Sequence, residues 1–196
     1  MKMMESQGRK KMFQALKKLV SNEPFDDVTV KDIVKCAGLN RQTFYYHFQD
    51  KYDCLQYCLD KIALENNQSI DYTKWQECYL RIFRYLDLNR NFIQNIVDSS
   101  AYSLFADFVL ESIDLMLRSV IISFKGRDAR ACANFDGQPW KLFEYGLQGI
   151  VINWFRDGLR ENPELLVNDL LNIDLNHLKM LLGIENLNEE VSVRHE

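Results

Sequence analysis

A chain of 196 residues in which 47% are hydrophobic is long enough to bury a core and too apolar to be disordered. It has no run of about eighteen uncharged apolar residues, which excludes a membrane span, so we expect a cytoplasmic protein whose five cysteines are reduced. The net charge is −4, yet residues 1–51 hold ten Lys and Arg against six Asp and Glu, which gives +4 there and −8 elsewhere. A basic first quarter on an acidic body suits a small DNA-contacting head, although a merely solvated basic face is the alternative.

Apolar residues recur at helical rather than alternating spacing, which predicts an all-α protein of about nine helices. The first helix would bury one apolar stripe opposite a basic face and end near Pro24. Thr29 and Asp32 then form an [ST]-x-x-[DE] capping box that begins a second, short helix, and Gly38 ends it. Asn40 would cap a third helix, which is also short. Two short helices around a glycine-containing turn predict a helix-turn-helix.

The predicted helices lengthen beyond this point. A fourth helix, about residues 50–66, would connect the N-terminal part to the rest of the chain. Further helices are expected over about 72–88, 89–97, 101–124 and 139–158, with an exposed connection over 125–138 and a final helix from Asn162-Pro163. We therefore predict a helix-turn-helix DNA-binding domain over residues 1–51 and a helical ligand-binding and dimerisation domain over residues 67–196.

The third predicted helix carries the candidate DNA contacts on its outer face. Arg41 and Gln42 have the fork and amide geometry that makes bidentate hydrogen bonds with guanine and adenine edges. Thr43 can touch a thymine methyl group or a phosphate, and the side chains better suited to the DNA backbone are Tyr45, Tyr46 and His47. Lys51 falls in the first turn of the next helix, where its charge and the free N–H groups of the helix end could hold one phosphate.

The alternative to DNA binding is a purely structural role, in which residues 29–51 are only a packed helical hairpin with Tyr45 and Tyr46 in its core. Periodicity argues against it, because Phe44 and Phe48 already occupy the inner face of the third helix. In the second helix we expect Cys36 to be a small buried apolar residue.

These residues also carry a family resemblance. Gly38, Thr43, the run 44–48 and the run 51–55 resemble the N-terminal motif of the TetR family, whose usual form is Gly, a short gap, then (Leu/Phe)-Tyr-x-(His/Tyr)-Phe-x-x-Lys-x-x-Leu. The resemblance spans roughly residues 9–62. It implies a three-helix DNA-binding domain, a helical effector domain and a homodimer that uses its last two helices.

The same resemblance implies roles for single residues. Positions that contact phosphate in the family are occupied by Thr43, Tyr45, Tyr46, His47 and Lys51, and positions that reach bases by Lys31, Arg41 and Gln42. The complete predicted set of DNA contacts is Thr29, Lys31, Arg41, Gln42, Thr43, Tyr45, Tyr46, His47 and Lys51.

The C-terminal part is rich in aromatic residues on helical stripes, which are more often core than binding site. The family resemblance implies a pocket for a small-molecule effector, whose identity the sequence does not give. The candidate pocket residues are Tyr79, Phe83, Phe105, Phe108, Met116 and Trp140. We expect no cofactor and no metal, since the chain has no paired His and Cys ligands.

Gly146 and Gly149 lie one helical turn apart and would let a partner helix approach closely, which predicts a dimer seam. The other candidate seam residues are Ile150, Trp154 and Leu178, and internal packing is the alternative. This stretch is also similar to the C-terminal domain of the TetR subgroup that contains dihydroxyacetone-kinase regulators.

The predicted function is a dimeric TetR-type transcriptional regulator, with no sign of an enzyme. We expect a repressor that binds double-stranded palindromic operator DNA and is released by a small-molecule effector. The alternative from another class is a TetR-like adaptor or co-activator that acts through a protein partner. A redox sensor built on Cys54 and Cys58 is a third hypothesis, weakened because two thiols one turn apart in a helix form a disulfide with difficulty.

Overall fold

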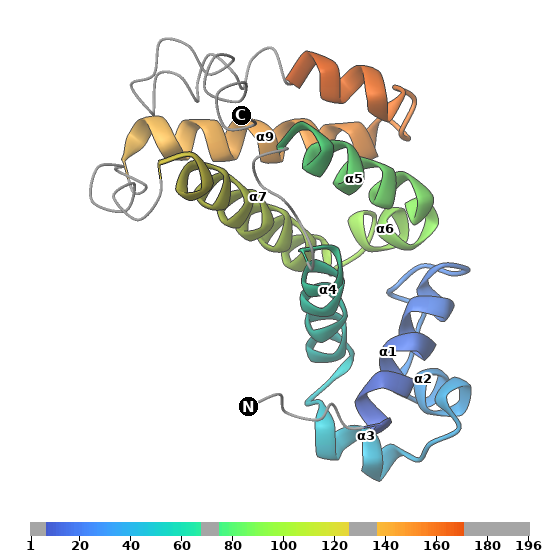
Figure 1. Ribbon diagram of the computed structural model, residues 1–196. Coiled ribbons are helices and arrows are strands. Elements are labelled where there is room, and N and C mark those ends of the chain that lie inside the picture. The colour runs from blue at the N-terminus through green and yellow to red at the C-terminus, as the bar shows by residue number, and fades with distance from the viewer. Residues whose placement is uncertain (1–6, 68–74, 126–136, 171–196) are drawn as a thin grey trace. The chain divides into compact units, whose positions relative to one another are not determined.

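A computed structural model describes residues 7–67, 75–125 and 137–170, and within these ranges the chain is helical without a strand (Figure 1). The predicted all-α fold is confirmed. The helices are α1 (Gln7–Val20), α2 (Val30–Ala37), α3 (Arg41–His47), α4 (Lys51–Asn67), α5 (Trp75–Leu88), α6 (Arg90–Val97), α7 (Tyr102–Lys125), α9 (Gln138–Arg156) and a helical stretch over 163–170.

The chain divides into two compact units, and each unit is made of two separate segments of the sequence. The head unit comprises Met1–Ser69 and Leu86–Val109, and the body unit comprises Ile70–Tyr85 and Leu110–Glu196. The head unit thus contains α1 to α4 and α6, and the division falls inside α5 and α7. Helix α6, which the sequence-based division counted with the C-terminal domain, packs on α1.

Local side-chain chemistry sets the ends of the head helices. The capping box predicted at α2 is present, since Thr29 Oγ1 accepts from the backbone N–H of Asp32 and the Asp32 carboxylate accepts from the N–H of Thr29. Gly38 ends α2 with φ +66°, a left-handed conformation that glycine adopts without a steric penalty. Asn40 caps α3 by accepting from the N–H of Thr43 at 2.8 Å. These caps fix the length of the turn between α2 and α3.

The core of the head unit is apolar and receives residues from α6. Phe44 and Phe48 pack with ring centroids 5.6 Å apart beneath α3. From α6, the Asn95 side-chain amide donates to the carbonyl of Val20 at 2.7 Å, and the Asn95 carbonyl accepts from the N–H of Phe25 at 3.3 Å. Four α6 residues are buried, namely Phe92, Ile93, Ile96 and Val97. The three-helix head is therefore completed by a helix that follows it by more than forty residues in the chain.

In the body unit, α7 and α9 bury broad apolar faces. Phe83 of α5 meets Trp154 of α9 with ring centroids 5.3 Å apart. The buried residues of α9 are Trp140, Phe143, Glu144, Leu147, Val151, Ile152, Trp154 and Phe155. Pro139 lies in the first turn of α9, as expected for a residue that lacks an N–H to donate.

Candidate nucleic-acid interface

The outer face of α3 presents polar and aromatic side chains to solvent. Tyr46 is 83% exposed and Tyr45 is also exposed, whereas Phe44 and Phe48 are buried. Arg41 and Gln42 are exposed at the first turn of the helix. The alternative that placed both tyrosines in a packed core is therefore wrong. The helix buries its phenylalanines and leaves the side chains suited to base edges and phosphates outside.

Thr29 and Thr43 are less available than the tyrosines. The Thr43 hydroxyl donates to Asn40 Oδ1 at 3.0 Å, and the Thr29 hydroxyl donates to the Asp32 carboxylate. Both threonines therefore use their hydroxyl protons in helix caps. Lys31, in the first turn of α2, is exposed.

The C-terminal end of α3 is held by α1. The Arg9 guanidinium donates through Nη2 to the carbonyl of His47 at 3.3 Å. It also lies over the rings of Phe48 and Tyr57, at 5.3 and 5.1 Å from their centroids. His47 is half-buried, with its ring edge-on to Tyr46 at 4.9 Å. Arg9, which sequence analysis did not single out, therefore supports the recognition helix from inside.

Lys51 lies differently from the prediction. Its ammonium group donates to the carbonyl oxygens of Phe25 at 3.0 Å, Asp26 at 3.0 Å and Val28 at 3.1 Å. The prediction that Lys51 holds a phosphate was drawn from its place in the first turn of α4 and from the family motif, and nothing in the pattern of the sequence pointed to these carbonyls.

The cysteines of the head unit divide into one exposed and two buried thiols. Cys36 is exposed, so the prediction that it is a small buried residue is wrong: it lies on the outer face of α2, whose inner face is filled by Ile33 and Val34. Cys54 and Cys58 are buried. Burial, together with the hydrogen bond to Cys54, raises the pKa of the Cys58 thiol well above its usual value. A protonated, buried thiol is a poor redox sensor, which removes support from that hypothesis.

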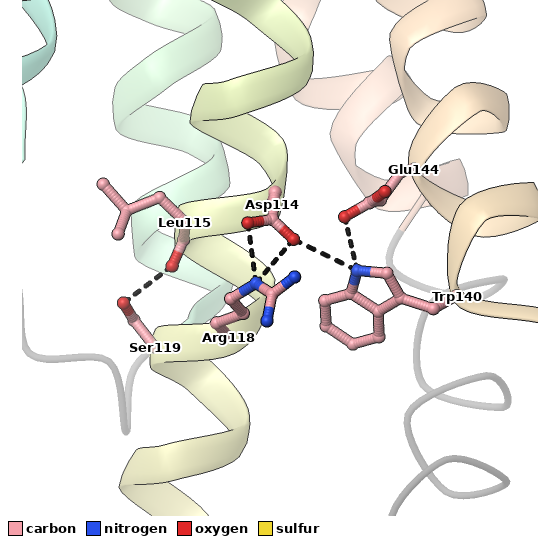
Figure 2. A network of polar contacts seen from close by, with 6 residues as sticks. All are labelled: Asp114, Leu115, Arg118, Ser119, Trp140 and Glu144. Atoms are coloured by element: carbon pink, nitrogen blue, oxygen red, sulfur yellow. Dashed lines mark hydrogen bonds and ion pairs between the residues drawn. The ribbon is translucent and has the colours of Figure 1, made fainter. Parts of the chain in front are cut away.

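The body unit contains a polar network between α7 and α9 (Figure 2). Arg118 Nε donates to both carboxylate oxygens of Asp114 at 2.7 Å, and the indole N–H of Trp140 donates to Asp114 at 3.1 Å and to Glu144. Glu144, 8% exposed, is the one charged residue in the core among residues whose burial is described. Burial and the neighbouring Asp114 raise the pKa of Glu144 to about 7. Burial opposes ionisation of Asp114 as well, but hydrogen bonds from Arg118, Glu144 and Trp140 keep its pKa lowered.

The predicted pocket residues do not gather in one unit. Phe105 and Phe108 belong to the head unit, and Phe83, Met116 and Trp140 belong to the body unit. All are buried except Phe108, which is half-buried. The side chain of Tyr79 lies outside the described residues. Trp140 donates its indole N–H to two carboxylates, and sequence analysis missed this polar network because the carboxylates come from separate helices.

The predicted dimer residues differ in their exposure to solvent. Gly146 and Gly149 are exposed on α9, with Leu142 and Tyr145 on the same face. Including Trp154 in the seam was wrong, since Trp154 is buried against Phe83 and its indole N–H donates to the carbonyl of Glu161 at 3.1 Å. Ile150 is half-buried, and Leu178 lies outside the described residues.

In the parts of the chain that the structure describes, no helix combines the length and apolar character needed to cross a membrane. The same ranges contain no group of three or more His, Cys, Asp or Glu side chains arranged to hold a metal ion.

A capped helix-turn-helix with an exposed recognition helix, attached to further helices, defines a DNA-binding regulator. Residues 13–58 match the family described as bacterial regulatory proteins, tetR family, and residues 73–173 match the family described as transcriptional regulator C-terminal region of the TetR type. The chain belongs to the TetR family of transcriptional regulators, and it is not an enzyme.

Several relatives share this fold. The chain is 36% identical over 84 residues to the transcriptional activator DhaS of the dhaKLM operon from Lactococcus lactis, a match that covers 42% of this chain and 45% of the relative. The solved structure of a dihydroxyacetone kinase operon activator DhaS has a TM-score of 0.69 and 24% identity, covering 90% of this chain and 99% of that one. NalD, a repressor from Pseudomonas aeruginosa, has a TM-score of 0.57 and 15% identity over 87% of this chain and 96% of its own. The matched segment spans less than half of the DhaS sequence, and the solved structures establish the fold alone.

Proposed function

We propose that the chain is a homodimeric, cytoplasmic TetR-type regulator that binds a palindromic operator through α3 and changes its affinity for that operator when a small-molecule effector binds. One observation carries the proposal. The exposed side chains of α3 include a guanidinium, an amide and two phenols, while the phenylalanines that could have filled this face are buried. Arg41 and Gln42 are proposed to contact base edges, and Tyr45 and Tyr46 to contact phosphates.

A homodimer is proposed to form through the exposed face of α9. Leu142 lies three and four residues before Tyr145 and Gly146, which lie four and three residues before Gly149, so the four residues share one side of the helix. Leu142 is 76% exposed and Tyr145 is exposed in the single chain. The two glycines add no side chain, and a Cβ built on either meets no atom within 4 Å. Large apolar residues next to glycines on one exposed face suit close packing against the same face of a second copy.

Control by an effector would follow from geometry. Two recognition helices can occupy successive major grooves only when they lie about 34–36 Å apart, or a whole-turn multiple of this distance. An effector that favours a different separation must weaken operator binding, and the operator must weaken effector binding by the same factor. The domain division proposed for this mechanism is the DNA-binding residues 1–51, the connecting helix, and the helical domain over 67–196.

The direction of regulation has two candidates. Repression is the prediction drawn from the sequence. The similarity to a relative named as an activator favours activation, with a protein adaptor or co-activator role as its variant. A reporter gene placed behind the selected operator separates them: deletion of the regulator raises expression for a repressor and lowers it for an activator.

The test of operator binding is selection from a random double-stranded DNA library at moderate salt, followed by sequencing. Enrichment of a palindrome supports the proposal and gives the operator. Failure to enrich any sequence, with the protein shown to be folded and dimeric, contradicts operator binding by the free protein and favours the adaptor. The Arg41→Ala variant is the matched control, since it should alter the selected bases without altering the dimer.

A further inference from the structure

The ammonium group of the half-buried Lys51 is bound by backbone carbonyls. Its three N–H groups match three carbonyl oxygens, those of Phe25, Asp26 and Val28, at 3.0 to 3.1 Å. The ring of Phe25 adds a cation–π contact, with its centroid 4.6 Å from Nζ. The lysine thus has its complete donor capacity satisfied within the protein. A phosphate could be reached only by leaving these carbonyls without their partner.

The three carbonyls belong to the connection between α1 and α2. In this segment Phe25 and Val28 are buried, and the next residue, Thr29, caps α2. The connection therefore determines where α2 begins, and α2 packs against α3. Lys51 is the first residue of α4. Its side chain consequently joins the start of the connecting helix to the start of the helix-turn-helix, across 23 to 26 residues of chain.

We propose that Lys51 is a positioning residue of the DNA-binding head, which orients α2 and α3 through the 24–29 connection and does not bind DNA phosphate. The proposal rests on the proposed function, because the orientation of α3 matters only for a protein that reads an operator. It differs from the role that the family motif implies for this lysine.

The two roles predict different salt dependence. Neutralising a lysine that pairs with a phosphate lowers the slope of log affinity against log salt by about one, and it weakens binding to all sequences alike. Neutralising a positioning lysine leaves the slope unchanged. It weakens operator binding more than non-specific binding, because non-specific binding does not require α3 to align with base edges.

The first experiment compares Lys51→Met, Lys51→Arg and Lys31→Met with the unaltered protein, on the selected operator and on unrelated DNA, from about 50 to 300 mM salt. Lys31 is the matched control, since it is exposed on α2 and is predicted to reach the DNA, where its ammonium group would displace a counterion whether it meets a base edge or a phosphate. We expect Lys31→Met to lower the slope by about one. We expect Lys51→Met to keep the slope but to lower the ratio of operator to non-specific affinity fivefold or more, roughly the effect of one misplaced contact.

Lys51→Arg should not restore that ratio, because a planar guanidinium cannot direct three N–H groups to one cluster of carbonyls. A lowered slope in Lys51→Met that Lys51→Arg restores would overturn the proposal.

A second measurement needs no variant and covers the case in which Lys51→Met fails to fold. In the unaltered dimer, NMR couplings across hydrogen bonds should connect Lys51 Nζ to the carbonyl carbons of residues 25, 26 and 28, both free and bound to operator. Loss of these couplings on DNA, with a new coupling to phosphorus, would overturn the proposal. If the protein binds no DNA, the proposed function fails, whereas the couplings in the free protein still decide whether Lys51 holds the connection.

Discussion

Helices α3 and α9 each bury aromatic residues on one side and expose large side chains on the other, but the exposed sides differ in chemistry. On α3 the exposed groups are hydroxyl, amide and guanidinium, with Tyr46 83% exposed. On α9 they include Leu142, Tyr145 and two glycines, and the polar residues Lys141, Asn153 and Arg156 are also exposed on this helix. A face that keeps hydrogen-bonding groups in water suits a polar, hydrated partner such as DNA. A face that exposes large apolar side chains next to glycines suits another protein surface, because removing apolar area from water is favourable.

The largest expected effect comes from charging the exposed face of α9. Leu142→Arg should convert the dimer to a monomer and lower operator affinity at least about a hundredfold, since a monomer holds one half-site only. Sedimentation and operator titration measure the two effects. Leu88→Arg is the matched control, because Leu88 is 84% exposed yet lies on α5, away from the proposed seam in sequence. If Leu142→Arg stayed dimeric, the exposed face of α9 would not be the dimer interface, and its contrast with the DNA-binding face of α3 would be lost.

The next effect is on the sequence preference of α3. Arg41→Ala should cost about 1–3 kcal/mol at one base pair of the operator and leave the other positions unchanged. Affinities for a set of operators, each altered at a single position, measure this loss. Equal weakening at every position would mean that Arg41 contacts phosphate instead.

Tyr46→Ala should have a smaller and uniform effect. Loss of a phosphate contact by an exposed phenol is expected to weaken binding by about 1 kcal/mol on operator and unrelated DNA alike. Tyr46→Phe isolates the hydroxyl and should reproduce most of the loss. If Tyr46→Ala altered sequence preference as Arg41→Ala does, the two residues would share one role.

The smallest expected effect concerns stability of the body unit. The pKa of Glu144 is about 7 in the folded protein against an ordinary value of 4.5. Between these pH values the folded chain binds more protons at this site than the unfolded chain, so stability should fall as pH rises from about 4.5 to about 7. Glu144→Gln should flatten this dependence in a series of thermal melts. Glu111→Gln, at an exposed position of α7, is the control and should leave the dependence as it was.

The sequence predicted the parts of the molecule that depend on neighbours in the chain. Thr29, Gly38 and Asn40 set helix ends through residues three or four positions away, so their roles were predicted correctly. The outer face of α3 followed from periodicity for the same reason. Cys36 was misjudged because one apolar residue on a short helix does not determine which side packs inward.

The contacts that sequence analysis missed are those between distant segments. Lys51 meets carbonyls that carry no side-chain signal, and Glu144 meets Asp114, thirty residues earlier, only once α7 and α9 have packed. The assignment of α6 to the head likewise depends on Asn95 and Val20 lying together, which no local pattern indicates.

The contacts of α6 also bear on how the protein is made. Asn95 satisfies the carbonyl of Val20, and Asp26 accepts from the backbone N–H of Ser100 at 3.1 Å. A nascent chain that has released only its first seventy residues therefore has all of its helix-turn-helix sequence but not the groups that complete it. Because domains generally fold as they leave the ribosome, the DNA-binding head must wait for about thirty more residues of translation before it closes. Ribosome-bound chains that still hold α6 inside the exit tunnel and longer chains that have released it should accordingly differ in the protease resistance of α1 to α3.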